Sequence, residues 1–567
     1  MKKQRKLKKK EDKFMKIEKY FGNYECNNFN KVVEYMTNLN ENLKNVYNFE
    51  FPFFKGNYER NFGEYLKNKK LNYNSMDPNK VFEYIAPYFE NIPNWSNPGT
   101  MINVIPPVNL TSLAATNIAN MYNPNFAQDT YSGMLITAEM EVAKYLSDLL
   151  GWDWKKTHGT FTFGGKGTNL YATKVALNKT DKLSSNIGLE RNKYFMITSK
   201  NGHPCHYEVC NWLGIGASNC YEIDCNENGQ MNLELAEKII DENINKGRYF
   251  IGYNLTAGST NELLVDEIKK VYDMNKRIVK KYHLQYSPHI HADAVLGWVY
   301  LFFKKYNFEK NELNIETNIL KKIKNMTEKV SELKYADSIG VDFHKTGFCP
   351  YVSSIVLFKN KEDYFTLCEA DNIEIDNLDF GNYNPYHSTL ELTRSSMGPL
   401  SALCSLKSLG VEGFQKIISN MFICTEHFRR QIKNNPKIEL INEETEGLAT
   451  LFIIKPNKYK DLNIKQIKKC SNEVIEEIKE YNVNFGKYIL RLAVENKIHF
   501  IFTSSRSYKL PNSNIKIGAL KSYPMSVHMT PELVENIVNE INKTIENYEK
   551  EKKTVEKYEL SDNMVYR

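Results

Sequence analysis

The spacing of hydrophobic and polar residues changes near residue 97. Before that point the chain is polar, rich in aromatic residues and without a strong period, which predicts an N-terminal extension with short helices over 1–95. Beyond it, short apolar segments bounded by Gly, Pro or Asn alternate with helical stretches, a pattern typical of βα units around a mainly parallel sheet. We therefore expect a large α/β domain over 96–415 and, where the alternation loosens, a smaller α+β domain over 416–567.

Individual elements can be predicted within the α/β region. Strands are expected at Tyr194–Thr198, Tyr249–Asn254, His289–Asp293, Ser338–Asp342 and Val352–Phe358. Helices are expected at Thr168–Leu177, Leu233–Asn243 and Leu264–Lys281, the last with apolar residues at helical spacing.

The positive charge of the chain is concentrated at its start. The 567 residues include 75 Lys plus Arg and 68 Asp plus Glu, for a formal net charge of +7. The first ten residues, MKKQRKLKKK, hold seven of the basic side chains and no acid, so the body that follows is balanced. This distribution argues against a specific nucleic-acid-binding body, and we expect the tail to be a solvated end rather than a site for RNA or an anionic membrane.

No membrane span or secretory signal is expected. The longest clear apolar run, Val295 to Phe303, is far shorter than the roughly 18 residues that cross a bilayer. The basic start leads into EDKFMKIEKY rather than an apolar stretch. These features predict a cytoplasmic protein.

The ten cysteines are expected to be reduced thiols. A cluster of Cys205, Cys210, Cys220 and Cys225, with His203 and His206 alongside, has four-residue gaps compatible with zinc ligands, yet the separation between its two pairs matches no common zinc module. We therefore favour ordinary buried thiols and predict no metal site.

Three short segments at predicted strand ends carry chemistry. GGKGTN (164–169) follows an apolar segment and opens a helix, so its backbone amides and the helix N-terminus suit an anion such as phosphate. HADA (291–294) and DFHKTG (342–347) place a carboxylate and a lysine at neighbouring strand ends. A desolvated lysine titrates lower and can form an imine, and a carboxylate can keep a pyridine ring protonated; the alternative is a structural Asp–Lys ion pair.

In order and spacing, six segments between about residues 97 and 530 resemble the pyridoxal-phosphate-dependent group II amino-acid decarboxylases. The segments are TFGGKGTN, HYEVCNWLGIG, TAGST with Asp266, HADA, DSIGVDFHKTGFCPY and TRSSMGPLSALCSLKSLGVEGF. The resemblance implies the fold type I of the aspartate aminotransferase superfamily, with a mainly parallel seven-stranded sheet and a small C-terminal α+β domain. It also implies pyridoxal 5'-phosphate as cofactor, a small amino-acid substrate and a homodimer.

The resemblance implies a role for each matching residue. Lys345 would bind the cofactor covalently, Asp293 would pair with the pyridine nitrogen, and His206 would stack on the ring. Loss of CO2 leaves a carbanion, which the cationic ring stabilises by accepting its electrons. The remaining cofactor-binding positions are Gly165, Lys166 and His344 near the phosphate and Thr256 beside the ring.

A long polar stretch between Phe358 and Arg394 is expected to be a functional loop. The family has a mobile loop here with a tyrosine that protonates the carbanion, and the candidates in this chain are Tyr383 and Tyr386. The sequence does not choose between them. Arg394 matches a family position for which we expect a structural role.

Several positions depart from the family pattern. Lys166 stands where Ser or Thr is usual, and Glu208 replaces the hydroxyl of the H-Y-S segment. The family's carboxylate-binding Arg in the C-terminal strand aligns with Met525. The run HKTGFCPY resembles tyrosine decarboxylases and sphingosine-phosphate lyases, which favours an aromatic substrate.

The leading prediction is decarboxylation of an L-amino acid to the amine and CO2. One alternative is a carbon–carbon lyase of the sphingosine-phosphate type, against which the HYEVCNWLGIG segment speaks. The other is a non-catalytic homologue that acts as a binding protein, although retention of Lys345, Asp293 and His206 argues against it.

Overall fold

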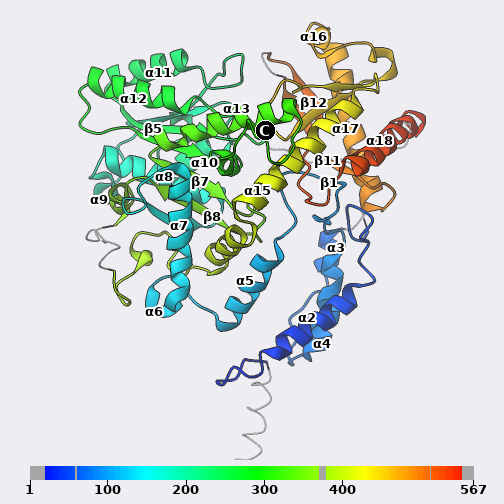
Figure 1. The fold of residues 1–567 in the computed structure, drawn as a ribbon, viewed down its shortest axis with the longest axis horizontal. Helices are drawn as coiled ribbons and strands as arrows, with labels where there is room; N and C mark the ends of the chain where they lie inside the picture. Colours follow the sequence, from blue (N-terminus) through cyan, green and yellow to red (C-terminus); the bar gives the residue numbers. More distant parts are fainter. Residues whose placement is uncertain (1–19, 58–60, 369–377, 511–512, 552–567) are drawn as a thin grey trace, which may run out of the picture. The chain divides into compact units, whose positions relative to one another are not determined.

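A computed structural model describes residues 20–57, 61–368, 378–510 and 513–551. The chain forms two compact units (Figure 1), the first made of residues up to Thr100 together with Tyr488–Ile501 and the second of Met101–Lys487 with the chain from Phe502 onward. Within the second unit we call 101–415 the large domain and the part after 415 the small domain. The basic tail, residues 1–10, lies outside the described residues.

Short helices make up the described N-terminal part of the first unit, as the absence of a strong hydrophobic period predicts. They are α2 (Asn30–Leu43), α3 (Phe62–Leu66), α4 (Pro78–Ile85) and the 3-10 helix η1 (Ala86–Phe89). Tyr35 of α2 and Phe82 of α4 hold two of these helices together, with ring centroids 5.4 Å apart.

A seven-stranded sheet forms the centre of the large domain, in the order β2-β8-β7-β6-β5-β3-β4. The pairs among β7, β6, β5, β3 and β4 are parallel, whereas β8 runs antiparallel to both β2 and β7. The prediction of a mainly parallel seven-stranded sheet is confirmed. The strands are β2 (His158–Thr162), β3 (Tyr194–Ser199), β4 (Cys220–Ile223), β5 (Tyr249–Thr256), β6 (His289–Asp293), β7 (Ser338–Asp342) and β8 (Ser354–Phe358).

Two of the predicted strands, β6 and β7, have the expected bounds, and one begins later than expected. β8 starts at Ser354 rather than Val352 because Ser353 belongs to the preceding turn, where its carbonyl accepts from the amide of Phe343 at 2.8 Å. β2 and β4 were not predicted, and β4 has only four residues.

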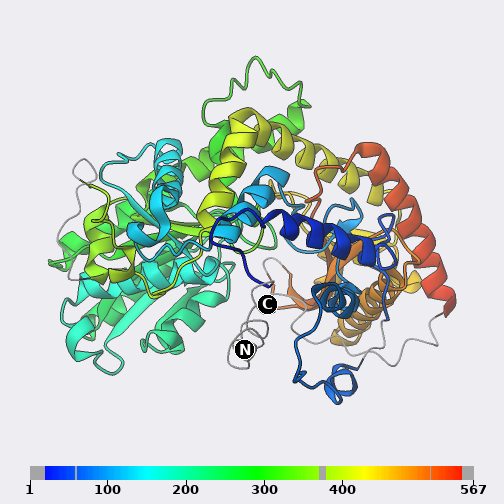
Figure 2. The same ribbon diagram turned by 90° about the horizontal axis from the view of Figure 1, so that it is seen from below.

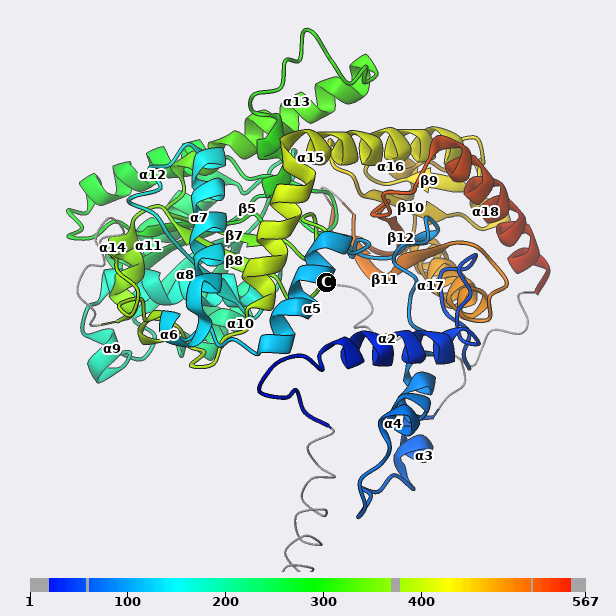
Figure 3. The same ribbon diagram turned by 60° about the horizontal axis from the view of Figure 1, so that its bottom comes forward.

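Helices cover both faces of this sheet (Figures 1 and 3). α8 packs against β5, β6, β7 and β8, while Ile240 of α11 and Val271 of α12 join the core that contains Tyr253 and Leu255 of β5. The helices of the large domain are α5 (Leu110–Tyr122), α6 (Asp129–Ser132), α7 (Thr137–Leu150), α8 (Gly165–Thr180), α9 (Ser184–Ile187), α10 (Cys205–Trp212), α11 (Leu233–Asn245), α12 (Ile268–Lys281), α13 (Thr317–Ser331) and α14 (Lys361–Tyr364).

A long bent helix, α15 (Met397–Ile432), leads from the large domain into the small one (Figure 3). Gly410 breaks its helical path with a φ of +57°, a conformation that glycine adopts without steric cost. The part before the bend packs on α5 and α7, and the part after it lies beside the C-terminal helix α18 (Pro531–Glu551), which Figure 2 shows in red.

An antiparallel sheet forms the small domain together with its helices. Strand β12 pairs with β11 and β10, and β10 pairs with β9. The elements are β9 (Ile438–Leu440), β10 (Thr450–Ile454), α16 (Ile464–Ile467), α17 (Asn472–Val494), β11 (Ile501–Lys509) and β12 (Lys516–Ser522). This mixture confirms the predicted α+β character of the C-terminal part.

The apolar run Val295 to Phe303 is buried in the core, largely as the 3-10 helix η4 (Gly297–Phe303). Among the described residues no helix is both long and apolar enough to cross a membrane.

Candidate active site

Three adjacent parallel strands bring the predicted site residues together, because their carboxyl ends meet at one edge of the sheet. Thr256 ends β5 and lies in register with Asp293, which ends β6. Lys345 follows β7 by three residues. The N-termini of α8 and α10 lie at the same edge: Asn169 of α8 donates from Nδ2 to Oδ2 of Asp293 at 3.2 Å and to Sγ of Cys205, the first residue of α10, at 3.5 Å.

Lys345 is held by a buried carboxylate. Its Nζ lies 2.9 Å from Oδ2 of Asp342, whose other oxygen accepts from the Ser354 hydroxyl at 2.6 Å. Burial acts to lower the pKa of Lys345, but the charges of Asp342 and Asp293 outweigh burial and raise that pKa above its usual value. The expectation that desolvation lowers the pKa of this lysine is therefore wrong, because the negative charge of Asp342, three residues earlier in the chain, opposes the effect of burial.

Asp293 stays ionised although it is only 6% exposed. Burial acts to raise its pKa, yet the combined influence of His206, His203, Lys345 and the Asn169 hydrogen bond leaves that pKa below the usual value. A buried carboxylate that is kept negative in this way is suited to hold a proton on a ring nitrogen.

Asn169 is a site residue that we did not single out from the sequence. Its Oδ1 accepts from Nδ2 of Asn254 on β5 at 3.0 Å, which fixes the orientation of the amide that bonds Asp293. Its place at the end of the GGKGTN segment, four residues after Gly165 and so one helical turn on, is the signal that could have identified it.

Two polar atoms converge without partners beside this carboxylate. Nε2 of His206 and Oγ1 of Thr256 are buried and have no hydrogen-bond partner among the described residues. A Cβ on Gly202 would lie 2.9 Å from Oγ1 of Thr256 and 3.4 Å from Nε2 of His206, so glycine keeps this space open. Burial lowers the pKa of His206 to about 4, which makes the ring neutral at physiological pH.

The expected phosphate-binding segment surrounds the start of α8. Gly164 has a φ of +126° and Gly165 begins the helix, where a Cβ would lie only 2.9 Å from Oδ2 of Asp342. His344 is 5% exposed, and its Nδ1 lies 3.0 Å from the carbonyl of Ser353. Free amides at a helix N-terminus favour an anion at this position.

The two departures from the expected motifs contact each other. Lys166 on the first turn of α8 forms an ion pair with Glu208 on α10. Both side chains are about half exposed, and the Glu208 hydrogen bond raises the pKa of Lys166 above its usual value. Lys166 and Glu208, which replace two small polar residues of the family pattern, thus neutralise each other's charge.

The cysteines lie mainly in apolar surroundings. Cys210 is fully buried, with its Sγ 3.2 Å from the sulfur of Met196, and Cys220 belongs to the same apolar cluster. Among the described residues one group has the proximity of metal ligands, Cys205, His206 and Asp293, whose ligand atoms lie within 4.8 Å of one another. Two of these three are also predicted cofactor-binding residues.

The loop tyrosines lie in different surroundings. Tyr383 is 5% exposed and packs with Phe126 and Ile136, and its amide donates to Oδ2 of Asp129 at 3.1 Å. Tyr386 is half-buried, with its ring 4.0 Å from that of His387. The loop also contains α14 and the 3-10 helices η6 (Phe365–Leu367) and η8 (Pro385–His387), while residues 369–377 lie outside the described chain. The catalytic role of either tyrosine stays a prediction.

Arg394 has the structural role that we expected. It forms a buried ion pair with Glu139, its Nη1 lying 3.2 Å from Oε1, and its Nη2 donates to the Thr160 hydroxyl at 2.8 Å. These bonds connect the chain before α15 to α7 and β2.

Met525, the position aligned with the family's strand arginine, is an apolar and buried residue. Strand β12 ends at Ser522, and Met525 lies beyond it with its side chain in the hydrophobic core. The strand has two basic residues, the exposed Lys516 and the buried Lys521; Lys521 is 3% exposed and donates from Nζ to Oδ1 of Asn261 at 3.3 Å. No carboxylate pairs with Lys521 in the described chain, and burial lowers its pKa to about 8.

A cavity of about 1540 Å³ adjoins this edge of the sheet. Gly202 and His203 form part of its wall, as do Thr260 and Asn261 after β5 and Tyr508 of β11. The cavity thus extends from the loops that follow β3 and β5 to the small domain.

Comparison with known proteins identifies the family. The model of the pyridoxal-dependent decarboxylase conserved domain matches residues 87–455, and the chain belongs to this family of carboxy-lyases. The probable L-aspartate decarboxylase of Thermococcus gammatolerans is 25% identical over 306 residues, which cover 54% of this chain and 67% of that protein. The first curated relatives are matched over 63 to 67% of their own length.

Solved structures share the fold at low sequence identity. Mouse CSAD superimposes with a TM-score of 0.73 at 16% identity, covering 91% of this chain and 98% of that one. The tryptophan decarboxylase of Catharanthus roseus, solved with L-tryptophan, gives 0.70 at 15% identity, covering 93% and 100%. These likenesses confirm the predicted fold class.

The residues present fit pyridoxal phosphate, the cofactor of this family. Asp293 offers an ionised carboxylate for a ring nitrogen, His206 and Thr256 point unpaired atoms into the open space beside Gly202, and Lys345 provides the amine. The helix N-terminus at Gly165 suits the phosphate.

Proposed function

We propose that this protein decarboxylates an L-amino acid, releasing the amine and CO2, with pyridoxal phosphate as cofactor. The observation that carries the proposal is the joint presence of an ionised buried Asp293, a half-buried Lys345 and unpaired polar atoms on His206 and Thr256 at one sheet edge. Bound pyridoxal phosphate supplies a conjugated cationic ring that accepts the electron pair left when CO2 departs.

The residues of the chain have separate tasks in this proposal. Lys345 bonds the cofactor and later carries a proton on Nζ, for which Asp342, 2.9 Å away, is the adjacent acceptor. Asp293 would accept the hydrogen bond of the ring nitrogen, and the neutral ring of His206 would help to hold the cofactor ring. Together these side chains orient the bond to the carboxylate relative to the ring.

Lys521 is proposed to bind a carboxylate of the substrate. A buried ammonium without a carboxylate partner is costly unless a ligand neutralises it. Its hydrogen-bond partner Asn261 lines the same cavity as Gly202 and His203, next to His206. Lys521 would take the place that the family's strand arginine has in the resemblance.

Two lines of support point to different substrates. The HKTGFCPY run favours an aromatic amino acid, whereas the curated relative from Thermococcus gammatolerans bears the name of an L-aspartate decarboxylase. We keep the aromatic substrate as the sequence-based proposal and include acidic amino acids in its test. A homodimer and a cytoplasmic location stay predictions, as does protonation of the product by Tyr383 or Tyr386.

The test is CO2 release by the full chain loaded with pyridoxal phosphate. L-tyrosine, L-tryptophan, L-aspartate and L-glutamate would be compared, with Lys345→Ala as the inactive variant and Lys144→Ala, on the exposed side of α7, as the matched control. We expect one substrate class to release CO2 with wild type and Lys144→Ala alone. Absence of CO2 from a broad amino-acid panel, despite bound cofactor, would contradict the proposal and favour the lyase or the non-catalytic alternative.

A further inference from the structure

A line of buried polar side chains runs beneath helix α8, from Asp293 to the opposite edge of the sheet. His289, His291 and Asp293 occupy alternate positions on β6 and therefore share one face of the sheet. Ser338 of the neighbouring strand β7 lies in register with His291. Lys179, in the last turn of α8, is at the far end of the line. Neither histidine before Asp293 has a role in the proposed chemistry.

The contacts along this line are continuous. Nζ of Lys179 lies 3.4 Å from Nδ1 of His289, whose Nε2 is 2.7 Å from the Ser338 hydroxyl. The same hydroxyl lies 2.8 Å from Nδ1 of His291. Both rings and the serine are at most 2% exposed, so water does not substitute for these partners.

The direction of each hydrogen bond follows from the lysine. An ammonium group has donors only, so Nδ1 of His289 accepts, and the hydrogen of this neutral ring is on Nε2, which donates to Ser338. Because His289 donates to it, the Ser338 hydroxyl is left to donate to Nδ1 of His291, a ring that also has a hydrogen-bond contact with the Ser338 backbone. The hydrogen of the His291 ring is consequently on Nε2.

This last N–H has no hydrogen-bond partner among the described residues, although it is buried. The negative charge of Asp293 acts on the His291 ring, raising its pKa against the larger effect of burial, which brings that pKa to about 3. The donors of Lys179, His289 and Ser338 all point along the line toward His291, so their dipoles add with the same sign. Hydrogen bonds in such a chain polarise one another in a low-dielectric interior.

We propose that Lys179, His289, Ser338 and His291 form an oriented hydrogen-bond chain that sets the tautomer of His291 and stabilises the negative charge of Asp293 at the cofactor ring. These four are positioning residues, since they act through Asp293. The inference rests on the role proposed for Asp293 in binding the cofactor.

Acidic groups fix the outer end of the chain. Asp363 accepts from Nζ of Lys179 at 2.7 Å. Oxygens of Asp363 and Asp337 are each 3.9 Å from Nδ1 of His289, too far to accept a hydrogen from it. Asp363 therefore holds the ammonium group of Lys179 at the end of the line, and Nδ1 of His289 is left to accept from it.

The first test locates the hydrogens directly. Neutron diffraction from deuterated crystals of the full chain should show density for hydrogen on Nε2 and none on Nδ1 of both His289 and His291. Hydrogen on Nδ1 of His291 would overturn the proposed direction. This measurement does not depend on whether the protein decarboxylates any amino acid.

The second test measures the coupling to Asp293 through cofactor binding. Lys179→Met and Ser338→Ala should each raise the dissociation constant of pyridoxal phosphate about fivefold, the size expected for one polar contact. Lys179→Arg, which keeps donors at this position, should restore the affinity to within about twofold, and Lys144→Met on α7 should leave it unchanged. The pH at which the absorbance of the bound cofactor changes should be lower in Ser338→Ala than in wild type, because the anion of Asp293 would be less stabilised.

Two outcomes would reject the coupling. One is unchanged affinity in both Lys179→Met and Ser338→Ala, measured on folded protein. The other is equal weakening by Lys179→Met and Lys179→Arg, which would indicate a packing effect rather than a directional bond. A correct tautomer with unchanged affinity would confine the chain to a structural role and overturn the inference.

Discussion

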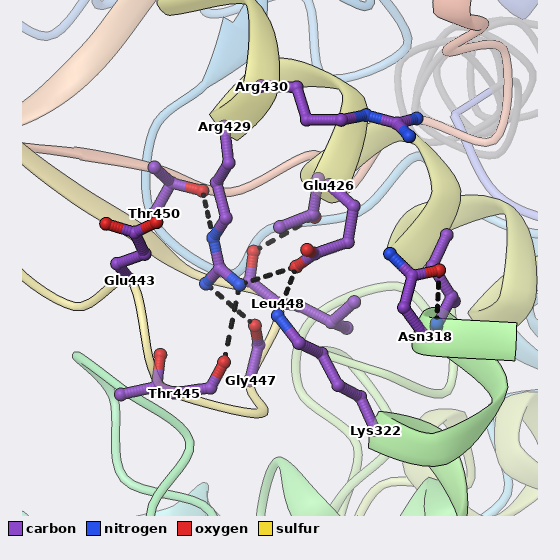
Figure 4. Close-up of polar contacts among 12 residues, drawn as sticks. Asn318, Lys322, Glu426, Arg429, Arg430, Glu443, Thr445, Gly447, Leu448 and Thr450 are labelled. Atoms are coloured by element: carbon purple, nitrogen blue, oxygen red, sulfur yellow. Dashed lines mark hydrogen bonds and ion pairs between the residues drawn. The ribbon is translucent and has the colours of Figure 1, made fainter. Parts of the chain in front are cut away.

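Two buried charged clusters in this molecule differ in how completely their polar atoms are paired. One surrounds Asp293 and Lys345 at the carboxyl edge of the large sheet. The other surrounds Arg429 on α15, in the small domain (Figure 4). Both are shielded from water, yet in one of them polar atoms remain without partners.

The Arg429 cluster uses nearly every donor of its guanidinium group. Nη1 donates to Oε1 of Glu426 at 2.7 Å, and Nη2 donates to the carbonyls of Gly447 and Ala449 at 3.0 and 2.8 Å. Lys322 of α13 donates to the same Glu426 oxygen at 2.9 Å (Figure 4). This cluster attaches the loop before β10 to the end of α15, and the guanidinium group at its centre is fully paired.

The cluster at the sheet edge leaves four buried atoms without partners among the described residues. They belong to Asn254 and Thr256 of β5, His291 of β6 and His206 of α10. Buried polar groups are nearly always paired in folded proteins, so several unpaired ones in one place indicate a missing ligand. A cluster whose charged groups are fully paired is thus typical of a structural role, whereas unpaired atoms that converge on one space indicate a binding site.

The largest effect is expected for Asp293→Ala. Loss of this carboxylate removes the charge that keeps the ring cationic, so the decarboxylation rate should fall about a thousandfold. The free energy of unfolding, measured with urea, should change little by comparison. Asp148→Ala, in an exposed pair with Lys144, serves as the control. A rate within tenfold of wild type would refute the role of Asp293.

For Arg429→Met we expect a large loss of stability and little change in cofactor binding. Breaking a buried pair leaves Glu426 less well compensated, so the free energy of unfolding should fall by about 3 kcal/mol. The affinity for pyridoxal phosphate should stay within about twofold, because Arg429 contacts no site residue among the described parts of the chain. The matched control is Arg430→Met, whose partner Glu316 is 3.3 Å away and about half exposed. That variant should lose less than about 1 kcal/mol. If Arg429→Met weakened cofactor binding as strongly as it destabilised the fold, the Arg429 cluster could not be called purely structural.

Much of this comparison could be predicted from the sequence, but the electrostatics could not. The strand ends of β6 and β7, and hence the positions of Asp293 and Lys345, follow from apolar runs bounded by polar residues. The raised pKa of Lys345 depends on Asp342 being buried with it, which the pattern does not reveal. Among the described residues Lys521 has no carboxylate partner, and this too depends on long-range packing.

Element boundaries failed where side chains compete for the backbone. The helix expected from Leu264 begins at Ile268, because the segment before it bonds to the end of β5: Asp266 accepts from the amide of Thr256 at 2.9 Å. Strand β4 was missed because it has only four residues and no regular alternation: Cys220 and Ile223 are buried, whereas Glu222 is exposed. Neither feature has a signature in hydrophobic periodicity.

Variants of Lys521 test whether this buried cation, which has no carboxylate partner among the described residues, binds the substrate. Lys521→Met should raise KM about tenfold with a smaller change in kcat, the cost of one charged hydrogen bond. Because the pKa of Lys521 is lowered to about 8, wild-type KM should rise as the pH increases through 8 and the ammonium loses its proton. Lys521→Arg stays charged and should remove this dependence. Identical pH profiles of KM in wild type and Lys521→Arg would exclude Lys521 as the carboxylate-binding group.

The smallest effect is expected for the half-exposed pair of Lys166 and Glu208. Glu208→Gln removes a negative charge near the start of α8, so the dissociation constant of pyridoxal phosphate should fall about twofold, while the free energy of unfolding should change by less than about 1 kcal/mol. Fluorescence titration of the cofactor-free protein measures the affinity. Weaker binding would instead mean that Glu208 holds Lys166 in position for the phosphate.

The central claim is that the incompletely paired cluster receives pyridoxal phosphate and that Lys345 bonds it. Borohydride reduction of the loaded protein, followed by peptide mass spectrometry, locates the bonded lysine directly. We predict one cofactor mass per chain, on the peptide that contains Lys345, and none in Lys345→Ala. Attachment to another lysine, or no attachment after reduction, would contradict the account.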